Sequence, residues 1–359
     1  NDSFVFTMIL SGAEMNKSIT KADPAGNVVW SKTVGQQIPA NPIIGAATGN
    51  ILPTEDLGLA LFDNAHTSTG QQNLFMSRLD TAGNLLWSRI WQGSIGALPF
   101  EQRTYDAKNA LTNDFIVGGI TIENLMIGGL LVNLDSLGEI NWGKRYNVLV
   151  GNAASTEIRA VESTVDSGYV IGGIYRNTSA LATGWVMKTD SIGNVIWSYL
   201  INDPTLTVIP NIFIQNVIPK DDGSTVVLGL QVEPPFSFAT KNFALKLSPA
   251  GAIEWQYYYY ENNQNPVINN LIMSNQVETI DGGYAAFGYT LENMTGDNIP
   301  IPYVLKIDQN GESSCQDTSN FQAFSIPVNV DSLFYTSQTL DFIDSLGIES
   351  ENYNLFSVP

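Results

Sequence analysis

The chain has 359 residues, of which 44% are hydrophobic, so it can bury a large core and is not a disordered polypeptide. Its 35 acidic and 16 basic residues give a formal net charge of −19, which argues against nucleic-acid partners and anionic lipid surfaces because like charges repel. No apolar run reaches the ~20 residues that a membrane-spanning helix needs. We therefore expect no membrane insertion.

A single cysteine and a single histidine limit the available chemistry. Cys315 allows no internal disulfide, and one Cys with one His cannot form a zinc site. His66 lies in a polar stretch, residues 63–70, which predicts a solvated loop residue and not a catalytic one. Because the first residue is Asn1, we expect that a signal peptide was removed from a secreted or outer-cell-surface protein.

A short pattern recurs six times: an apolar run, a turn acid or serine, a glycine three residues later, and usually a tryptophan four residues after that glycine. One copy reads Lys188-Thr-Asp190-Ser-Ile-Gly193-Asn-Val-Ile-Trp197. Asp and Gly supply turn chemistry, so each copy predicts a β-hairpin. The anchoring glycines, spaced by 57, 55, 55, 58 and 60 residues, are Gly26, Gly83, Gly138, Gly193, Gly251 and Gly311.

A second strand pair precedes each later hairpin. Two examples are residues 158–165 with 169–175, and 272–280 with 284–290. Their turns are expected at Asp56, Asp114, Asp166, Asp222 and Asp281. Four strands in about 55 residues, repeated six times without helical periodicity, are typical of a β-propeller.

We therefore predict an all-β fold in which residues 1–315 form a single six-bladed β-propeller of four-stranded blades. The first unit lacks its innermost strand, because residues 3–11 match the second strand of later units. Residues 316–359 are expected to supply the missing strand, close the ring and end in a tail. Residues 320–330 and 333–342 are alternatives for the closing strand.

The position four residues after each glycine is expected to pack between blades. It holds Trp30, Trp87, Trp142, Trp197, Trp255 and, in the last copy, Cys315, which we interpret as a small buried thiol. Basic residues recur at two further positions, and we expect them to pair with turn acids or to lie over the tryptophans. They are Lys21, Arg78, Lys188, Lys246 and Lys306, and then Lys32, Arg89 and Lys144.

The Leu-Asp-x-x-Gly-Asn-x-x-Trp repeats, together with the Asp-Gly-Gly-Tyr turn at residues 281–284, resemble secreted β-propeller repeat proteins of Bacteroidota over residues 3–315. The resemblance implies cargo of the type IX secretion system, which often carries a C-terminal sorting domain that export removes. A weaker likeness is to the tryptophan-docking blades of pyrroloquinoline-quinone enzymes, whose turns have one more residue between Asp and Gly. A sialidase-like site is not expected, because the sequence shows no arginine cluster to hold a carboxylate.

We predict a non-enzymatic secreted or cell-surface propeller that mediates protein–protein interaction, adhesion or surface assembly. The sequence shows no nucleophile–base constellation and no cofactor motif, so we predict no catalytic residue and no cofactor. Each turn offers one carboxylate, whereas Ca²⁺ takes roughly six to eight oxygens, so we predict no metal site. The alternatives are a glycan-binding propeller, for which Tyr257–Tyr260 followed by residues 261–264 is the best cluster, and a glycan-active enzyme.

The central axis is the first place to expect a ligand. Counting six residues back from the turn acids gives a largely polar column on the predicted innermost strands, formed by Asn50, Lys108, Ala160, Asn216 and Asn275. The alternative is a channel in which water solvates these residues.

The family resemblance also implies O-glycosylation at Asp-(Ser/Thr)-apolar triplets. The acceptor hydroxyls belong to Thr81, Ser136, Ser191, Ser332 and Ser345. The first three lie at predicted hairpin tips, where a sugar would not disturb the core. Ser and Thr are also common in turns for their own hydrogen bonds.

Overall fold

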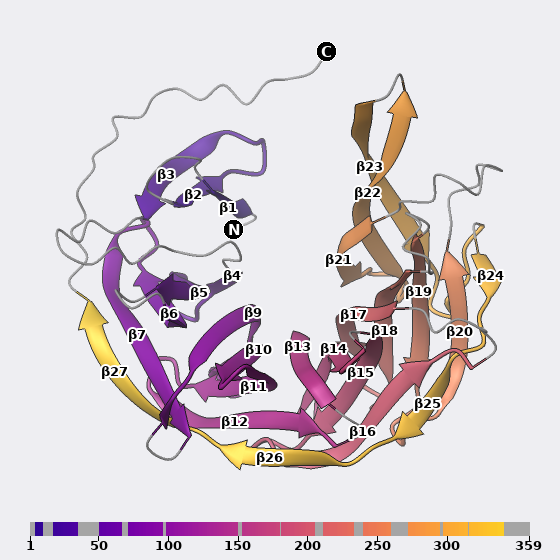
Figure 1. Ribbon diagram of the computed structural model, residues 1–359. Coiled ribbons are helices and arrows are strands. Elements are labelled where there is room, and N and C mark those ends of the chain that lie inside the picture. Colours follow the sequence, from indigo (N-terminus) through magenta and orange to yellow (C-terminus); the bar gives the residue numbers. More distant parts are fainter. Residues whose placement is uncertain are drawn as a thin grey trace.

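The computed structural model describes residues 4–9, 17–34, 50–66, 71–95, 98–149, 153–179, 181–204, 211–232, 240–259, 272–294, 297–314 and 316–340. Their regular structure consists of β-strands, as the sequence predicted. Within these ranges there is no helix long and apolar enough to cross a membrane. The strands follow one another around a central axis (Figure 1).

Up to Ile307, the described strands form six units in which each strand pairs antiparallel with the next, and a two-residue strand β8 (Leu98–Pro99) pairs with β7. The first unit contains β1 (Phe4–Ile9), β2 (Lys17–Ala22) and β3 (Val28–Val34), and the second β4 (Asn50–Pro53), β5 (Leu59–His66), β6 (Gln72–Leu79) and β7 (Leu85–Ile95). The third contains β9 (Glu101–Asn109), β10 (Phe115–Glu123), β11 (Met126–Leu134) and β12 (Ile140–Val148). The fourth contains β13 (Ala153–Ser163), β14 (Tyr169–Asn177), β15 (Ala182–Thr189) and β16 (Val195–Asn202). The fifth contains β17 (Asn211–Pro219), β18 (Thr225–Val232), β19 (Thr240–Leu247) and β20 (Ile253–Tyr259), and the sixth β21 (Ile272–Glu278), β22 (Tyr284–Met294) and β23 (Asp297–Ile307).

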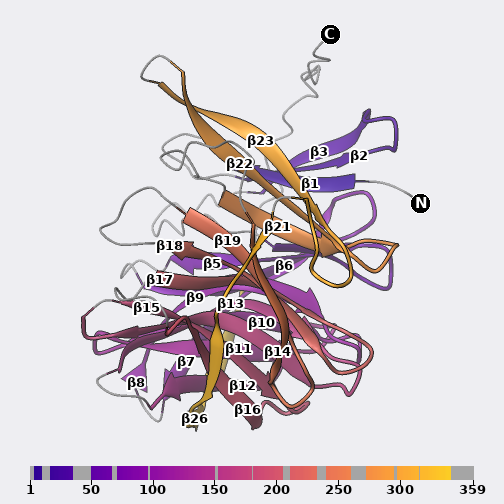
Figure 2. The same ribbon diagram turned by 90° about the vertical axis from the view of Figure 1, so that its right-hand side faces the viewer.

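The turn residues explain why the strands reverse where they do. Between β6 and β7, Asp80 Oδ1 accepts the backbone N–H groups of Ala82 and Asn84 at 2.9 and 2.8 Å. Gly83 adopts a φ of +79°, a backbone conformation that is unfavourable for residues with a Cβ atom. The two turns of a unit lie at the same end of its strands, so turns from all units gather on one side of the molecule, which we name the turn face (Figure 2).

The first strands of the later units lie closest to the axis (Figure 1), where β9 contacts β13 and β13 contacts β17. The last strand of a unit reaches the turn of the following unit. For example, the hydroxyl of Tyr146 in β12 donates a hydrogen bond to the carbonyl oxygen of Gly193 at 2.7 Å. Such contacts fix each unit against its neighbour.

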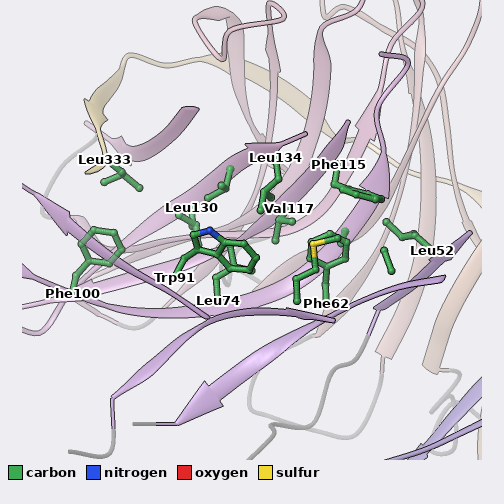
Figure 3. Close-up of a cluster of buried hydrophobic side chains, with 14 residues drawn as sticks. Leu52, Phe62, Leu74, Trp91, Phe100, Phe115, Val117, Leu130, Leu134 and Leu333 are labelled. Carbon is green, nitrogen blue, oxygen red and sulfur yellow. The ribbon is translucent and has the colours of Figure 1, made fainter. Parts of the chain in front are cut away.

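Hydrophobic cores fill the space between consecutive units. Figure 3 shows one of them, in which Leu74 and Trp91 of the second unit pack with Phe115, Val117 and Leu130 of the third. Trp91 is fully buried. Large buried aromatic side chains contribute strongly to stability, so these cores hold consecutive units together.

The C-terminal segment corrects our expectation about the closing strand. It runs back around the outside and adds a strand to four units in reverse order (Figure 1): β24 (Gln316–Thr318) pairs with β20, β25 (Gln322–Ser325) with β16, β26 (Val328–Ser332) with β12, and β27 (Phe334–Leu340) with β7. We name β24–β27 the belt. Both segments expected to close the ring, as far as Leu340, therefore lie on the perimeter. The belt gives partners to backbone groups of outer edges that would otherwise be unpaired.

The sixth unit also differs from the prediction. After Gly311 the chain turns to the neighbouring unit, because residues 316–318 pair with Tyr257–Tyr259 of β20 and not with β23. Cys315 lies outside the described residues, so its packing stays a prediction. Among the strands that are described, none pairs the first unit with the sixth.

Candidate functional site

The innermost strands of four successive units carry a β-bulge at the same place. At this bulge the residues without a partner on the second strand are Tyr105 in β9, Arg159 in β13, Gln215 in β17 and Ser274 in β21, the last with its side chain outside the described residues. Glycine opposite the bulge makes this geometry possible, because a Cβ on Gly119 would lie only 2.0 Å from the carbonyl oxygen of Arg103. Bulges redirect side chains, and here they place three polar residues at the axis.

Tyr105 and Arg159 lie against each other in this region. The guanidinium carbon of Arg159 is 4.0 Å from the centre of the Tyr105 ring, a cation–π contact. The buried Glu157 accepts hydrogen bonds from Nε and Nη2 of Arg159 and from Nε of Arg176, the last at 3.2 Å. Burial raises the pKa of the Tyr105 hydroxyl. A buried carboxylate thus positions two arginines beside a tyrosine.

Arg103 extends the group along β9. Its Nε donates to Glu101 at 3.0 Å, and its charge acts on Tyr105 together with those of Arg159 and Arg176. We name these six residues the axial cluster: Glu101, Arg103, Tyr105, Glu157, Arg159 and Arg176. The sequence showed no arginine cluster, because these arginines are far apart in the chain. The fold brings them together, so that argument against a carboxylate site was wrong.

Asp106 lies beside the axial cluster, at the bulge of β9. Its Oδ2 accepts the backbone N–H of Val161 at 3.0 Å, and its Oδ1 is 3.9 Å from Nζ of Lys108. Burial raises the pKa of Asp106 to about 6, although Lys108 and the Val161 N–H oppose the shift. Burial alone would lower the pKa of Lys108, but Asp106 and Glu162, the latter 2.7 Å away, outweigh it and raise that pKa.

The predicted axial column needs a correction in the third unit. In the second to sixth units, the column residue of the innermost strand pairs with the fourth residue of the second strand. These column residues are Asn50, Asp106, Ala160, Asn216 and Asn275, so Asp106 and not Lys108 belongs to the column. The error came from the turn between β9 and β10. There Thr112, just before the positive-φ residue Asn113, takes the place of the turn acid, and Asp114 takes the place that glycine holds in the second and fourth units.

The other members of the column interact differently. Asn50 Nδ2 donates to the carbonyl oxygen of Tyr105 at 3.4 Å, which links the second unit to the third. Asn216 Oδ1 accepts the backbone N–H of Val217 at 2.9 Å, and Ala160 is buried. Asn275 lies on β21, with its side chain outside the described residues. The column therefore includes structural contacts between units.

Ion pairs on the turn face use the repeated basic residues. Arg78 binds both carboxylate oxygens of Asp56 at 3.0 Å, and Lys188 is 2.6 Å from Asp166. Lys246 with Asp222 and Lys306 with Asp281 repeat the arrangement at 3.6 and 2.8 Å. The third unit has Asn133 in place of the basic residue and Thr112 in place of the acidic one, so both partners of this ion pair are replaced by uncharged residues.

Large apolar side chains stand exposed among these charges. In the turns after the first strands, Leu57, Leu111, Val165 and Ile280 are 76, 59, 60 and 109% exposed. At the tips of the outer hairpins, Leu137 and Ile192 are 66 and 56% exposed. An exposed apolar side chain by itself is common, but here they recur in one unit after another on the same face.

The five tryptophans are half buried and lie at the boundary with the following unit. A Cβ on Gly138 would be 2.5 Å from the Trp87 ring, and one on Gly311 would be 2.6 Å from the Trp255 ring. Trp30 and Trp142 cover Gly83 and Gly193 in the same way, and Trp197 Nε1 donates to the carbonyl oxygen of Pro249 at 3.1 Å.

The tyrosine run proposed for glycan binding takes part in packing. Tyr258 and Tyr259 are both buried, and Tyr257 stacks beside Trp255 with the ring centres 6.1 Å apart. The Tyr259 hydroxyl donates to the carbonyl oxygen of Gly311 at 2.7 Å. Tyr260 and residues 261–264 lie outside the described residues.

Several remaining candidates can be placed. The expected glycan acceptors Thr81, Ser136, Ser191 and Ser332 are exposed, and Ser345 lies outside the described residues. His66 is the last residue of β5, where it pairs with Gln72, so its backbone is in a strand and not in the predicted loop. In the described part of the chain, no three Asp, Glu, His or Cys side chains are grouped as metal ligands.

No protein-family model matches the chain, and no curated protein matches its sequence. Among solved structures, a protein of unknown function from Bacteroides caccae is similar with a TM-score of 0.45 and 13% identity, over 88% of this chain and 93% of its own. A GH43 β-1,3-galactosidase has a TM-score of 0.37 and 11% identity, over 85% of this chain and 66% of its own. A bifunctional GH43-CE protein of Bacteroides eggerthii has a TM-score of 0.29 and 10% identity, over 96% of this chain and 53% of its own. Likenesses this distant say nothing about activity.

Proposed function

We propose that the six units are the blades of one β-propeller, and that this secreted or cell-surface protein binds another protein through its turn face. The apolar tips of that face carry the proposal. Leu57, Leu111, Val165 and Ile280 each present more than half of their surface to solvent, although the chain buries apolar residues readily elsewhere. Covering such side chains on association removes them from water, which contributes roughly 25 cal/mol of favourable free energy per Å² of apolar surface buried.

The charges around the tips indicate the kind of partner. Turn acids surround the apolar side chains, and the chain as a whole carries a net charge of −19. Several of these acids already hold a lysine or arginine of this chain, so the face combines apolar tips with a moderately acidic border. A partner with an apolar patch bordered by Lys or Arg is complementary to it. Adhesion or surface assembly would use such a contact.

A turn-face variant and a matched control test this function. In the first, Leu111→Ser, Val165→Ser and Leu137→Ser are combined; in the second, Leu125→Ser and Met126→Ser change exposed residues at the opposite end of the third unit. Crosslinking on intact cells and mass spectrometry identify the partner, and binding is then measured with both proteins purified. We expect the turn-face variant to bind at least about tenfold more weakly, or ~1.4 kcal/mol, and the control to bind as the wild type does. Equal binding by both variants would refute the proposal.

O-glycosylation at the turn face is part of the same proposal. Thr81, Ser136 and Ser191 are exposed at hairpin tips, where each preceding aspartate is held by backbone N–H groups and the hydroxyl is accessible to a transferase. Intact-mass measurement on natively secreted protein tests it. A mass equal to that of the bare polypeptide excludes modification.

A glycan-active enzyme is the second candidate, and Asp106 is the observation that favours it. A carboxyl group with a pKa near 6 at the centre of the molecule can hold and release a proton near neutral pH, as a general acid must. Hydrolysis of any member of a glycan panel by the wild type, and its loss in Asp106→Asn, would establish this activity. Without turnover, the binding function is retained.

A further inference from the structure

The axial cluster concentrates positive charge in a strongly acidic protein. It contains three of the six arginines of the chain, Arg103, Arg159 and Arg176, against two carboxylates, Glu101 and Glu157. The axial cluster therefore has a formal net charge of +1, in a chain with a net charge of −19. The arginine side chains are 42, 35 and 31% exposed, so a ligand from solvent can reach all three.

Internal ion pairs use only part of the guanidinium donors. Glu157 takes Nε and Nη2 of Arg159 and Nε of Arg176. Within the described residues, Nη1 of Arg159 and both terminal nitrogens of Arg176 make no hydrogen bond. Because Glu157 is buried and fixed, it holds these planar groups in place before a ligand arrives, and Arg forks suit carboxylates in particular.

The neighbouring groups suit hydroxyls. Gln215 occupies the equivalent bulge on the next innermost strand, and its Oε1 is buried with no hydrogen-bond partner in the described structure. This oxygen is an acceptor, so it needs a donor such as a sugar hydroxyl and not a second anion. The Tyr105 ring, already under Arg159, adds an aromatic surface and a hydroxyl.

We propose that the axial cluster binds an acidic sugar, with the carboxylate on Arg159 and Arg176 and a ring hydroxyl on Gln215. A neutral sugar lacks the acid group that the arginines bind, and inorganic phosphate lacks the sugar ring that would present a hydroxyl to Gln215 while an acid group lies on the arginines. The site is separate from the turn face, so protein binding and sugar binding can fail independently.

Isothermal titration calorimetry with the full chain tests the proposal, using N-acetylneuraminate and galacturonate as acidic probes. Galactose and inorganic phosphate are the comparison probes. We expect saturable binding of at least one acidic sugar, weakened by added salt because the arginines are partly exposed. Binding of galactose or phosphate as tight as that of the acidic sugars would overturn the proposal, and so would no heat from either acidic sugar.

Variants locate the binding site. Arg176→Gln should weaken binding of the acidic sugar by about tenfold or more, since it removes the two terminal guanidinium nitrogens that make no internal hydrogen bond. Gln215→Leu should weaken binding of the acidic sugar but leave the salt dependence of the affinity unchanged, because the variant removes an uncharged acceptor. Arg89→Gln, which changes an arginine on the turn face, is the matched control and should bind normally. Thermal melting confirms that each variant is folded, and unchanged binding in folded Arg176→Gln would overturn the assignment.

Discussion

The hydroxyl of Tyr146 donates a hydrogen bond to the carbonyl oxygen of Gly193 over 2.7 Å, which joins the last strand of the third unit to a turn of the fourth. Tyr146 is fully buried, and burial raises the pKa of its hydroxyl strongly. Tyr259 makes the same kind of bond to the carbonyl oxygen of Gly311 at the boundary between the fifth and sixth units, also at 2.7 Å. Buried tyrosines thus link the third unit to the fourth and the fifth to the sixth.

Replacing Tyr146 by Phe removes this hydrogen bond and leaves the carbonyl of Gly193 without its partner. We expect the free energy of unfolding to fall by about 1–3 kcal/mol, as for other buried hydrogen bonds that lose one group. Chemical denaturation measures the change. Tyr199→Phe is the control, because its bond to the carbonyl oxygen of Ala250 at 2.8 Å is exposed and water can replace it. Equal losses in both variants would contradict this explanation.

Two turn glycines separate the cost of backbone conformation from the cost of packing. Gly26 and Gly138 have φ values of +86° and +79°, but a Cβ on Gly26 has no atom within 4 Å whereas one on Gly138 meets Trp87 at 2.5 Å. Gly26→Ala should cost about 1 kcal/mol from the backbone alone. Gly138→Ala should cost about 1–3 kcal/mol more, because the tryptophan must move. Similar denaturation midpoints for both variants would show that the tryptophan contact contributes little.

Local chemistry explains how much of this fold could be predicted from the sequence. The turns at Gly26 through Gly311 form where an Asp or Ser and a Gly of the same short segment favour them, so these turns were predicted correctly. The axial column failed in the third unit because Asp114 was taken for the turn acid. Asn133, which stands where other units have a base, was the signal that the acid had moved.

The belt and the axial cluster could not be predicted in this way. Thr336 pairs with Gln92, and no local pattern in either segment identifies its partner. Likewise, Arg103, Arg159 and Arg176 show no spacing that relates them, because their proximity depends on bulges in two innermost strands and on Glu157. Long-range pairing of edges and bulge geometry are tertiary effects.

Ending the chain at Ser319 tests the role of the belt, since it removes β25, β26 and β27. We expect faster hydrogen exchange in the outer strands β7, β12 and β16, whose edge groups lose their partners, with less change in the innermost strands β9 and β13. The truncated protein should also be less stable, because Phe321 and Leu333 leave the cores. Unchanged exchange in β12 would mean that the belt does not protect that edge.

The turn-face ion pairs predict sensitivity to acid. The Thr54 hydroxyl and Arg78 lower the pKa of Asp56 to about 2, and Lys188 with Thr164 lowers that of Asp166 to about 2. A carboxyl group with a depressed pKa stabilises the folded state while it is ionised. This contribution is complete above the unfolded pKa of 3.8 and is lost as the pH falls towards 2. Asp56→Asn should therefore lower stability at pH 6 slightly and reduce its decline below pH 4, as followed by thermal melting.

Asp106 predicts the opposite dependence in a higher pH range. Burial raises its pKa from 3.8 to about 6, so the unfolded chain ionises at a lower pH than the folded protein does. The folded state is therefore favoured below about pH 4, and this contribution is lost as the pH rises to about 6. Asp106→Asn keeps an oxygen that can accept the Val161 N–H but removes the ionisation. We expect the variant to melt at a higher temperature than the wild type at pH 7, and the difference to shrink at pH 4.5. Lys108→Met, which removes the neighbouring cation, should enlarge the loss of stability between pH 4 and 6. An Asp106→Asn variant whose melting temperature follows that of the wild type at every pH would show that Asp106 is solvated and ordinary, and would also remove the basis for its role as a general acid.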